Sequence, residues 1–219
     1  MIMDKQKPFI ITISRELGSG GRTVGRLLAE RLGVRYSDKE LIQALREEFH
    51  LTTDAIERLK GEKKNWLASF LQKVAPKPKA ENVVEWDEKF VQEYQPNLGS
   101  DDIFEAEKQI LRGIAQEGSC VIAGRSGFFV LKDFPNKVNI FITAPRENRI
   151  RRVMAKQHLS EQEAEAAIDR VDQGRENYIK RYTGVSRYDA RNYDLVINMD
   201  NLPDENAAVE LILKYLGIK

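Results

Sequence analysis

The sequence predicts an α/β domain with a five-stranded parallel sheet flanked by helices, and three observations predict it. Five short runs of apolar, mostly β-branched residues alternate with segments of helical periodicity. The first run leads into a glycine-rich loop and then into a helix. The composition is that of a globular protein, with 42% hydrophobic and 32% charged residues among 219. We therefore expect a single domain over residues 1–219.

The elements follow one another in the order that such a sheet requires. Apolar runs predict strands at residues 9–13, 34–36, 119–123, 138–143 and 193–198. Periodicity and end signals predict helices at 23–33, 101–116, 145–157 and 204–216, and a long helix that begins at the capping box of Ser160 and Glu163. Further helices are expected from Asp38 to about 49, after Thr52 and at 65–74. Helices between parallel strands cover both faces of the sheet.

Charge and composition restrict the classes of function. The 35 basic and 34 acidic residues give a net charge of +1, which does not favour a nucleic-acid partner. No run approaches the roughly 20 apolar residues of a membrane span, and the polar first eight residues do not resemble a signal peptide. We expect a cytoplasmic protein without a membrane partner, and the oligomeric state stays open. The one cysteine, Cys120, lies in a strand and is expected to be inert.

A phosphate-binding loop is predicted between the first strand and the first helix. Glycines let backbone N–H groups face a phosphate, and the following helix adds the positive end of its dipole. The predicted nucleotide-binding residues are Arg15, Gly18, Ser19, Gly20, Gly21, Arg22 and Thr23. The hydroxyl of Thr23 is placed to reach a magnesium ion. A tight turn that binds nothing is the alternative, which the strand before the loop and the helix after it disfavour.

The loop departs from the phosphate-loop signature, which ends in Gly-Lys-Ser/Thr. No lysine lies between Arg15 and Thr23, and Gly21 stands where the lysine would be. Arginine also binds phosphate, with two parallel hydrogen bonds. We therefore predict that Arg22 or Arg15 replaces the lysine. If neither does, the loop binds phosphate but transfers it poorly.

A second charged cluster lies at residues 169–175, on the helix that the capping box begins. Arg170 and Arg175 are five residues apart, with Asp172 between them. Spacing alone favours a solvated face with weak salt bridges. The alternative is a lid that closes over the site, because phosphoryl transfer needs positive charge around the migrating group.

Three segments together resemble the cytidylate kinase-like family of nucleoside monophosphate kinases. They are Ile-Ser-Arg-Glu-Leu-Gly-Ser-Gly-Gly-Arg at residues 13–22, Tyr-Ser-Asp-Lys-Glu-Leu-Ile at 36–42 and Val-Ile-Ala-Gly-Arg at 121–125. The resemblance covers about residues 9–216. It implies an adenylate-kinase-like P-loop NTPase fold that uses ATP and magnesium. It also implies a core at 8–37 and 101–219, an acceptor-binding helical insert at about 38–99 and a lid at about 158–191.

The resemblance also implies residue roles in the lid. Asp169, Arg170, Asp172 and Arg175 match the Asp-Arg-x-Asp-x-x-Arg pattern of cytidylate kinase. By that match, Arg170 and Arg175 contact the transferring and acceptor phosphates and are catalytic together with Arg22. Asp172 faces the nucleoside or holds an arginine.

On the acceptor side, Gly124–Arg125 matches the acceptor-binding strand end, so Arg125 is expected to bind the monophosphate, and Asp38 opens the acceptor-binding region. This chain has Ser126 where cytidylate kinase has aspartate after that Gly-Arg. It has Asp-Lys-Glu at residues 38–40 where that enzyme has Asp-Ser-Gly. Contacts to the base and the sugar are therefore expected to differ.

The leading prediction is a phosphotransferase that moves a phosphoryl group from ATP, with magnesium, to a nucleoside monophosphate such as CMP or dCMP. The changed residues at 39, 40 and 126 leave open a kinase of the same fold with another small-molecule acceptor. The missing lysine leaves open a module that binds nucleotide without turnover.

Overall fold

The computed structural model describes residues 3–38, 101–124 and 126–218. These residues contain a five-stranded sheet in which all neighbouring strands are parallel, in the order β2-β3-β1-β4-β5. The strands are β1 (Ile10–Arg15), β2 (Arg35–Ser37), β3 (Cys120–Ala123), β4 (Lys137–Thr143) and β5 (Leu195–Asn198). The predicted fold class is confirmed, and the helices expected between Asp38 and 74 lie outside the described residues.

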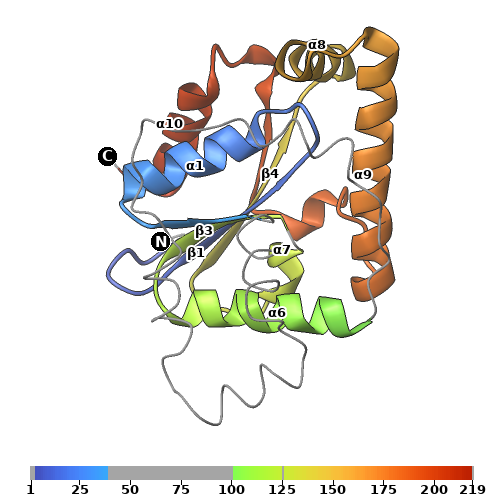
Figure 1. Ribbon diagram of the computed structural model, residues 1–219. Coiled ribbons are helices and arrows are strands. Elements are labelled where there is room, and N and C mark those ends of the chain that lie inside the picture. The colour runs from blue at the N-terminus through green and yellow to red at the C-terminus, as the bar shows by residue number, and fades with distance from the viewer. Residues whose placement is uncertain (1–2, 39–100, 125, 219) are drawn as a thin grey trace.

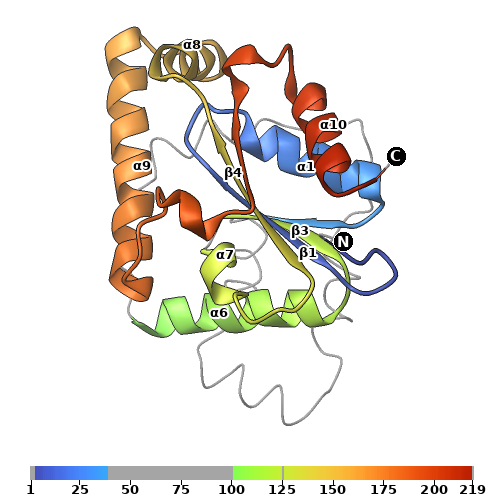
Figure 2. The same cartoon turned by 180° about the vertical axis from the view of Figure 1, so that it is seen from behind.

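Helices cover both faces of the sheet (Figure 1). The helices are α1 (Gly21–Leu32), α6 (Asp101–Gln116), the short α7 (Gly127–Val130), α8 (Arg146–Gln157), α9 (Glu161–Thr183) and α10 (Glu205–Tyr215). Figure 1 and the opposite view in Figure 2 show α1 and α10 side by side on one face, and α6 with α7 on the other. The long α9 runs along the side of the domain from α8 toward α6. No helix in the described part of the chain is both long and apolar enough to cross a membrane.

The core is divided by the sheet into two layers, because successive strand residues point to opposite faces. Ile10 packs toward α6, in a cluster with Cys120, Ile122, Leu111 and Ile114. Its neighbour Ile11 packs toward α1 and α10, in a cluster with Ile13, Val24, Val121 and Ile212. Both isoleucines are fully buried. Burial on both faces explains why β1 has a continuous apolar sequence, the pattern from which the strand was predicted.

Strand β1 lies at the centre of the sheet, between β3 and β4. Its carboxyl end lies beside Ala123 of β3 and Ile142 of β4. Ligands of open α/β sheets bind beyond the carboxyl ends of the strands, where the chain connections diverge. The loop that follows β1 is therefore positioned where a ligand is expected.

A third apolar cluster joins α8 and α9 to this loop. It contains Leu17 from the loop, Ile150 and Val153 from α8, and Ala164, Ala167, Ile168 and Val171 from α9. The predicted capping box at the start of α9 is confirmed, since the Ser160 N–H donates to Glu163 Oε2 at 2.8 Å and Ser160 Oγ accepts from the Glu163 N–H. Hydrogen bonds from Ser160 lower the pKa of Glu163. The buried side chains of this apolar cluster hold α8 and α9 against the loop.

We expect Cys120 to resist modification in the folded protein. The side chain is 1% exposed, and burial raises the pKa of its thiol to about 12. A raised pKa leaves almost no thiolate near pH 8, and the thiolate is the reactive form. Titration with a thiol reagent should give no signal in native buffer and one equivalent in denaturant. Full labelling within minutes in native buffer would contradict the buried position of β3.

Candidate active site

The glycine loop of residues 14–23 leaves backbone N–H groups open at the start of α1. Gly18 and Gly20 have φ values of 79° and 83°, in the left-handed region that favours glycine. Gly20 is the N-cap of α1 and provides no side-chain hydrogen bond to the first turn. The N–H groups of that first turn have no carbonyl partner within the helix, so they and the helix dipole can bind an anion.

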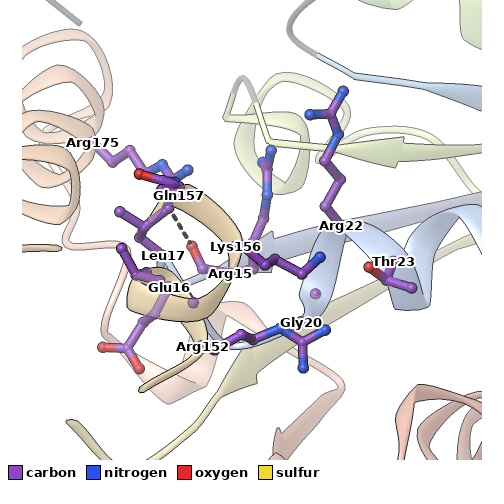
Figure 3. A pocket seen from close by; sticks show the side chains of 13 residues that line it. Arg15, Glu16, Leu17, Gly20, Arg22, Thr23, Arg152, Lys156, Gln157 and Arg175 are labelled. Carbon is purple, nitrogen blue, oxygen red and sulfur yellow. Dashed lines mark hydrogen bonds between the residues drawn. The ribbon is translucent and has the colours of Figure 1, made fainter. Parts of the chain in front are cut away.

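A cavity of about 50 Å³ lies over this loop. Its walls come from the loop, α8 and α9, and they consist of Arg15, Glu16, Leu17, Gly18, Gly20, Gly21, Arg22, Thr23, Arg152, Val153, Lys156, Gln157 and Arg175 (Figure 3). A buried water needs about 10–15 Å³ by the same measure, so the cavity has room for a few waters or one phosphate group. Five basic side chains and one carboxylate line it, which favours an anionic ligand.

Most of the nucleotide-binding residues predicted from the sequence meet at this cavity. Its walls include six of the seven, namely Arg15, Gly18, Gly20, Gly21, Arg22 and Thr23, together with Arg175, which was predicted as a catalytic residue. Ser19 is buried beneath the loop, where its hydroxyl donates to the carbonyl of Glu16 at 2.9 Å. Arg170 is exposed and lines a different cavity. Arg125 lies outside the described residues.

The two candidate replacements for the missing lysine both point toward the neighbouring strands β2 and β3. The Arg22 guanidinium forms an ion pair with Asp38, just after β2, at 3.1 Å. The Arg15 guanidinium lies over Gly124, just after β3, so close that a Cβ on Gly124 would be 2.2 Å from Nη1. Figure 3 shows the Arg22 side chain extending away from Arg152 of α8. Their charges therefore lie toward the side where acceptor binding is predicted.

The structure also explains why position 21 is glycine. A Cβ added to Gly21 would lie 2.6 Å from Arg15 Cβ and 3.2 Å from Ile142 Cβ. Real Cβ atoms almost never approach another heavy atom closer than 3.0 Å. The position where the phosphate-loop signature has lysine is thus occupied by the stem of Arg15.

Asp172 is a buried carboxylate that holds arginines, which is one of the two roles considered for it. Oδ1 accepts hydrogen bonds from the Leu17 N–H at 3.0 Å, from Arg175 at 3.1 Å and from Arg187 at 3.4 Å. Oδ2 accepts from Arg149 at 2.7 Å. The residue is 6% exposed. This single side chain therefore links the loop, α8, α9 and the segment after α9.

Two further contacts fix α9 and the segment after it to the loop backbone. Arg175 donates to the carbonyl of Arg15 at 3.2 Å, and Arg187 donates to the same carbonyl. The Arg187 guanidinium also lies over the rings of Phe141 and Tyr188, at 5.7 and 5.2 Å from their centroids. The geometry makes Arg175 a wall of the cavity and Arg187 a structural support beneath it.

The basic face of α8 contributes residues that sequence reasoning missed. Arg149, Arg152 and Lys156 are spaced by three and four residues, so they share one face of the helix. Arg149 binds Asp172, while Arg152 forms an ion pair with Glu205 at the start of α10, over Gly20. The spacing was visible in the sequence, but many surface helices carry such a face. Only the packing of α8 on Leu17 turns it toward the loop.

A second cavity of about 550 Å³ has Asp172 among its walls. Arg170, Tyr188 and the ion pair of Arg146 with Asp169 contribute to its walls. That pair is exposed, with a distance of 2.6 Å, and the hydrogen bond from Arg146 lowers the pKa of Asp169. Asp169 thus behaves as the solvated salt-bridge residue that spacing alone favoured, whereas Asp172 does not.

The donor groups at the loop are of the kind that a nucleotide phosphate and an accompanying magnesium ion require. The described residues contain no group of three or more His, Cys, Asp or Glu side chains that could hold a metal on their own. Magnesium in kinase sites is usually bound by one or two protein oxygens together with substrate phosphates. Thr23 offers its hydroxyl at the cavity wall, beside the N–H groups of α1 that would face those phosphates.

Comparisons with known proteins agree with this arrangement. The sequence model of the cytidylate kinase-like family matches residues 10–201. The cytidylate kinase of Sulfurisphaera tokodaii is 26% identical over 215 residues, which cover 96% of this chain and 98% of that protein. The cytidylate kinase of Sulfolobus acidocaldarius is 28% identical over 127 residues, covering 56% of this chain and 69% of that protein.

Solved structures share the fold at lower identity. An uncharacterized protein from Eubacterium ventriosum superimposes with a TM-score of 0.66 at 23% identity, and the match covers 96% of this chain and 99% of that one. Shikimate kinase from Bacteroides thetaiotaomicron superimposes with a TM-score of 0.52 at 15% identity and the same coverage. The chain therefore belongs to the cytidylate kinase-like family and is a phosphotransferase, as the sequence predicts.

Proposed function

We propose that this protein transfers the γ-phosphoryl group of ATP, with magnesium, to a nucleoside monophosphate, with CMP and dCMP as the first candidates. The observation that carries the proposal is the basic cavity over the glycine loop, into which α8 and α9 bring further cations. The two cytidylate kinases among the relatives support the choice of CMP.

The loop and α9 have separate roles in the proposed reaction. The N–H groups at the end of the loop and in the first turn of α1 would bind the phosphates of ATP, and Thr23 would hold the accompanying magnesium ion through its hydroxyl. Arg175, held by Asp172 at the cavity wall, stabilises the charge on the transferring group. An oxygen of the acceptor phosphate bonds to the γ-phosphorus as the bond to ADP breaks. Such transfer relies on positioning and charge, without a covalent enzyme intermediate.

The acceptor phosphate is proposed to bind beyond the ends of β2 and β3. Arg15 and Arg22 direct their guanidinium groups there, next to Gly124 and Asp38. Arg125 follows Gly124 directly and completes the proposed acceptor site. In this arrangement Arg22 acts on the acceptor side and is oriented by Asp38.

The test is ADP release from ATP and magnesium, coupled to a spectroscopic readout, with CMP, dCMP, UMP, AMP or GMP and with no acceptor. We expect CMP or dCMP to raise the rate well above the no-acceptor control, toward the 1–100 s⁻¹ that is typical of kinases. Chelation of magnesium should return the rate to that of the control. Stimulation by a different monophosphate would correct the base, and stimulation by none would exclude the proposed acceptor class.

A kinase of the same fold with another small acceptor is the second candidate, and Ser126 favours it. Ser126 stands where cytidylate kinase has aspartate. It is 3% exposed, and its hydroxyl has no hydrogen-bond partner among the described residues. A hydroxyl lacks the negative charge and the second acceptor oxygen of a carboxylate, so contacts at this position differ from those of cytidylate kinase. The same assay with free nucleosides and shikimate as acceptors separates the two candidates, because the shikimate kinase of Bacteroides thetaiotaomicron shares the fold.

A further inference from the structure

The glycine loop has glycine where the phosphate-loop signature has lysine, and the guanidinium groups of its two arginines, which also line the cavity, are directed toward β2 and β3. Position 21 has no space for a side chain beside the stem of Arg15. Arg22 is bound to Asp38, and the guanidinium of Arg15 lies over Gly124. We infer that Lys156 of α8 supplies the missing ammonium group to the β- and γ-phosphates of ATP. The inference rests on the proposed function only in naming ATP as the nucleotide.

The position of Lys156 is the first support. It lines the same small cavity as Gly20, Gly21 and Thr23. Figure 3 shows its side chain extending from α8 across the loop toward the start of α1, where Gly20 and Arg22 are labelled. Its ammonium group therefore enters the cavity where the N–H groups of α1 would bind phosphate. A lysine on a neighbouring helix thus reaches the region that the loop lysine occupies in the usual signature.

The second support is that Lys156, unlike the two arginines on the same face of α8, forms no ion pair with a described carboxylate. Arg149 and Arg152, on the same face of α8, are each bound to a carboxylate, Asp172 and Glu205 respectively. In the described part of the chain no carboxylate forms an ion pair with Lys156. A half-buried ammonium at a cavity wall gains a partner when an anionic phosphate arrives, without first breaking an ion pair to a described residue.

The backbone beneath Lys156 is fixed, which is the third support. Val153, one turn earlier, is 3% exposed and packs in the cluster that joins α8 to Leu17 and α9. The position of Lys156 relative to the loop is therefore set by buried contacts. Its four-carbon stem leaves the ammonium free to adjust by a few ångströms, as a flexible phosphate ligand should.

The test compares nucleotides that differ only in phosphate number. Binding of ATP, ADP and AMP to the full chain is measured by calorimetry with magnesium and without acceptor. We expect Lys156→Ala to weaken ATP binding by about 10- to 100-fold, the value of a charge-assisted hydrogen bond. AMP binding should change by less than about twofold, because AMP has no β- or γ-phosphate. Lys156→Arg should restore most of the ATP affinity.

Lys214→Ala is the matched control, since it removes an exposed lysine near the end of α10, far along that helix from Glu205. It should bind all three nucleotides as the unmodified protein does, and thermal unfolding should be unchanged in both alanine variants. Equal losses of ATP and AMP binding in Lys156→Ala would overturn the inference and indicate a structural role. Unchanged ATP binding in Lys156→Ala with a loss in Arg22→Ala would overturn it in favour of the loop arginine.

The outcome is separable from that of the proposed function. If no monophosphate stimulates ADP release but Lys156→Ala selectively loses ATP, the proposed acceptor fails and the role of Lys156 stands. If monophosphates stimulate ADP release while Lys156→Ala retains both turnover and ATP affinity, the proposed function stands and the inference fails. An unmodified chain that binds no ATP would contradict both.

Discussion

Replacing Asp172 with alanine should destabilise the protein by about 3–5 kcal/mol, the cost of breaking a buried ion pair by removing one partner. The carboxylate receives hydrogen bonds from Arg149, Arg175, Arg187 and the backbone of Leu17. Arg149 and Arg187 are themselves buried, so the substitution leaves cations in the interior without this carboxylate. The free energy of unfolding is measured by urea denaturation, followed by circular dichroism.

Asp169→Ala is the matched control for this effect. Asp169 lies on the same helix and also binds an arginine, Arg146, but both partners are exposed. Exposed ion pairs contribute about 0–1 kcal/mol, so this variant should unfold close to the unmodified protein. Asp172→Asn should fall between the two, because the amide oxygen still accepts hydrogen bonds but carries no charge. If Asp172→Ala and Asp169→Ala lost the same stability, Asp172 would not hold the loop and the helices together.

Gly18→Ala should abolish tight ATP binding and also lower stability. A Cβ at position 18 would lie 2.6 Å from the carbonyl oxygen of Arg149 and 3.0 Å from its Cα, so the loop and α8 must separate. Overpacking of this kind costs about 1–3 kcal/mol, and the left-handed φ of 79° adds about 1–2 kcal/mol for a residue with a side chain. Displacing the loop from α8 also disrupts the cavity between them. Calorimetry with ATP and urea denaturation measure both effects.

Gly33→Ala separates the clash from the backbone strain. Gly33 also has a left-handed φ, of 64°, but a Cβ there would have nothing within 4 Å. It caps α1 at the end remote from the loop. This variant should lose only about 1–2 kcal/mol of stability and keep its ATP affinity. Equal losses of ATP affinity in the two variants would show that the contact of Gly18 with α8 does not shape the site.

The strands were predictable because each corresponds to a short, mostly apolar run in the sequence, and these runs contribute side chains to the two core clusters on either face of the sheet. The continuous apolar run of β1 indicates a strand buried on both faces, and such strands belong to parallel sheets. The capping box at Ser160 was equally local, since both of its hydrogen bonds join residues three apart. The short α7 was missed, because four residues at Gly127–Val130 carry no periodicity.

The site was predictable only in its backbone. The glycine loop was predicted from its own sequence, and most of its residues lie together at the wall of one cavity. The direction of the Arg22 side chain depends on Asp38, and the role of Asp172 depends on Arg149, which is 23 residues away. The basic face of α8 lies toward the loop because α8 packs against Leu17. Sequence spacing contains none of these tertiary contacts.

The contact between Arg15 and Gly21 makes the two positions interdependent. Substituting lysine at position 21 alone would create a clash at 2.6 Å with the Arg15 stem, so the common signature cannot be regained in one step. The atom at 2.6 Å is the Cβ of Arg15, which every residue except glycine has, so shortening the Arg15 side chain would not relieve the contact. Substitutions at positions 15 and 21 are therefore not expected to be additive, because the two residues would be in contact. A side chain at position 21 requires the start of α1 to move away from Arg15 and Ile142, and a substitution at position 21 alone does not provide that movement.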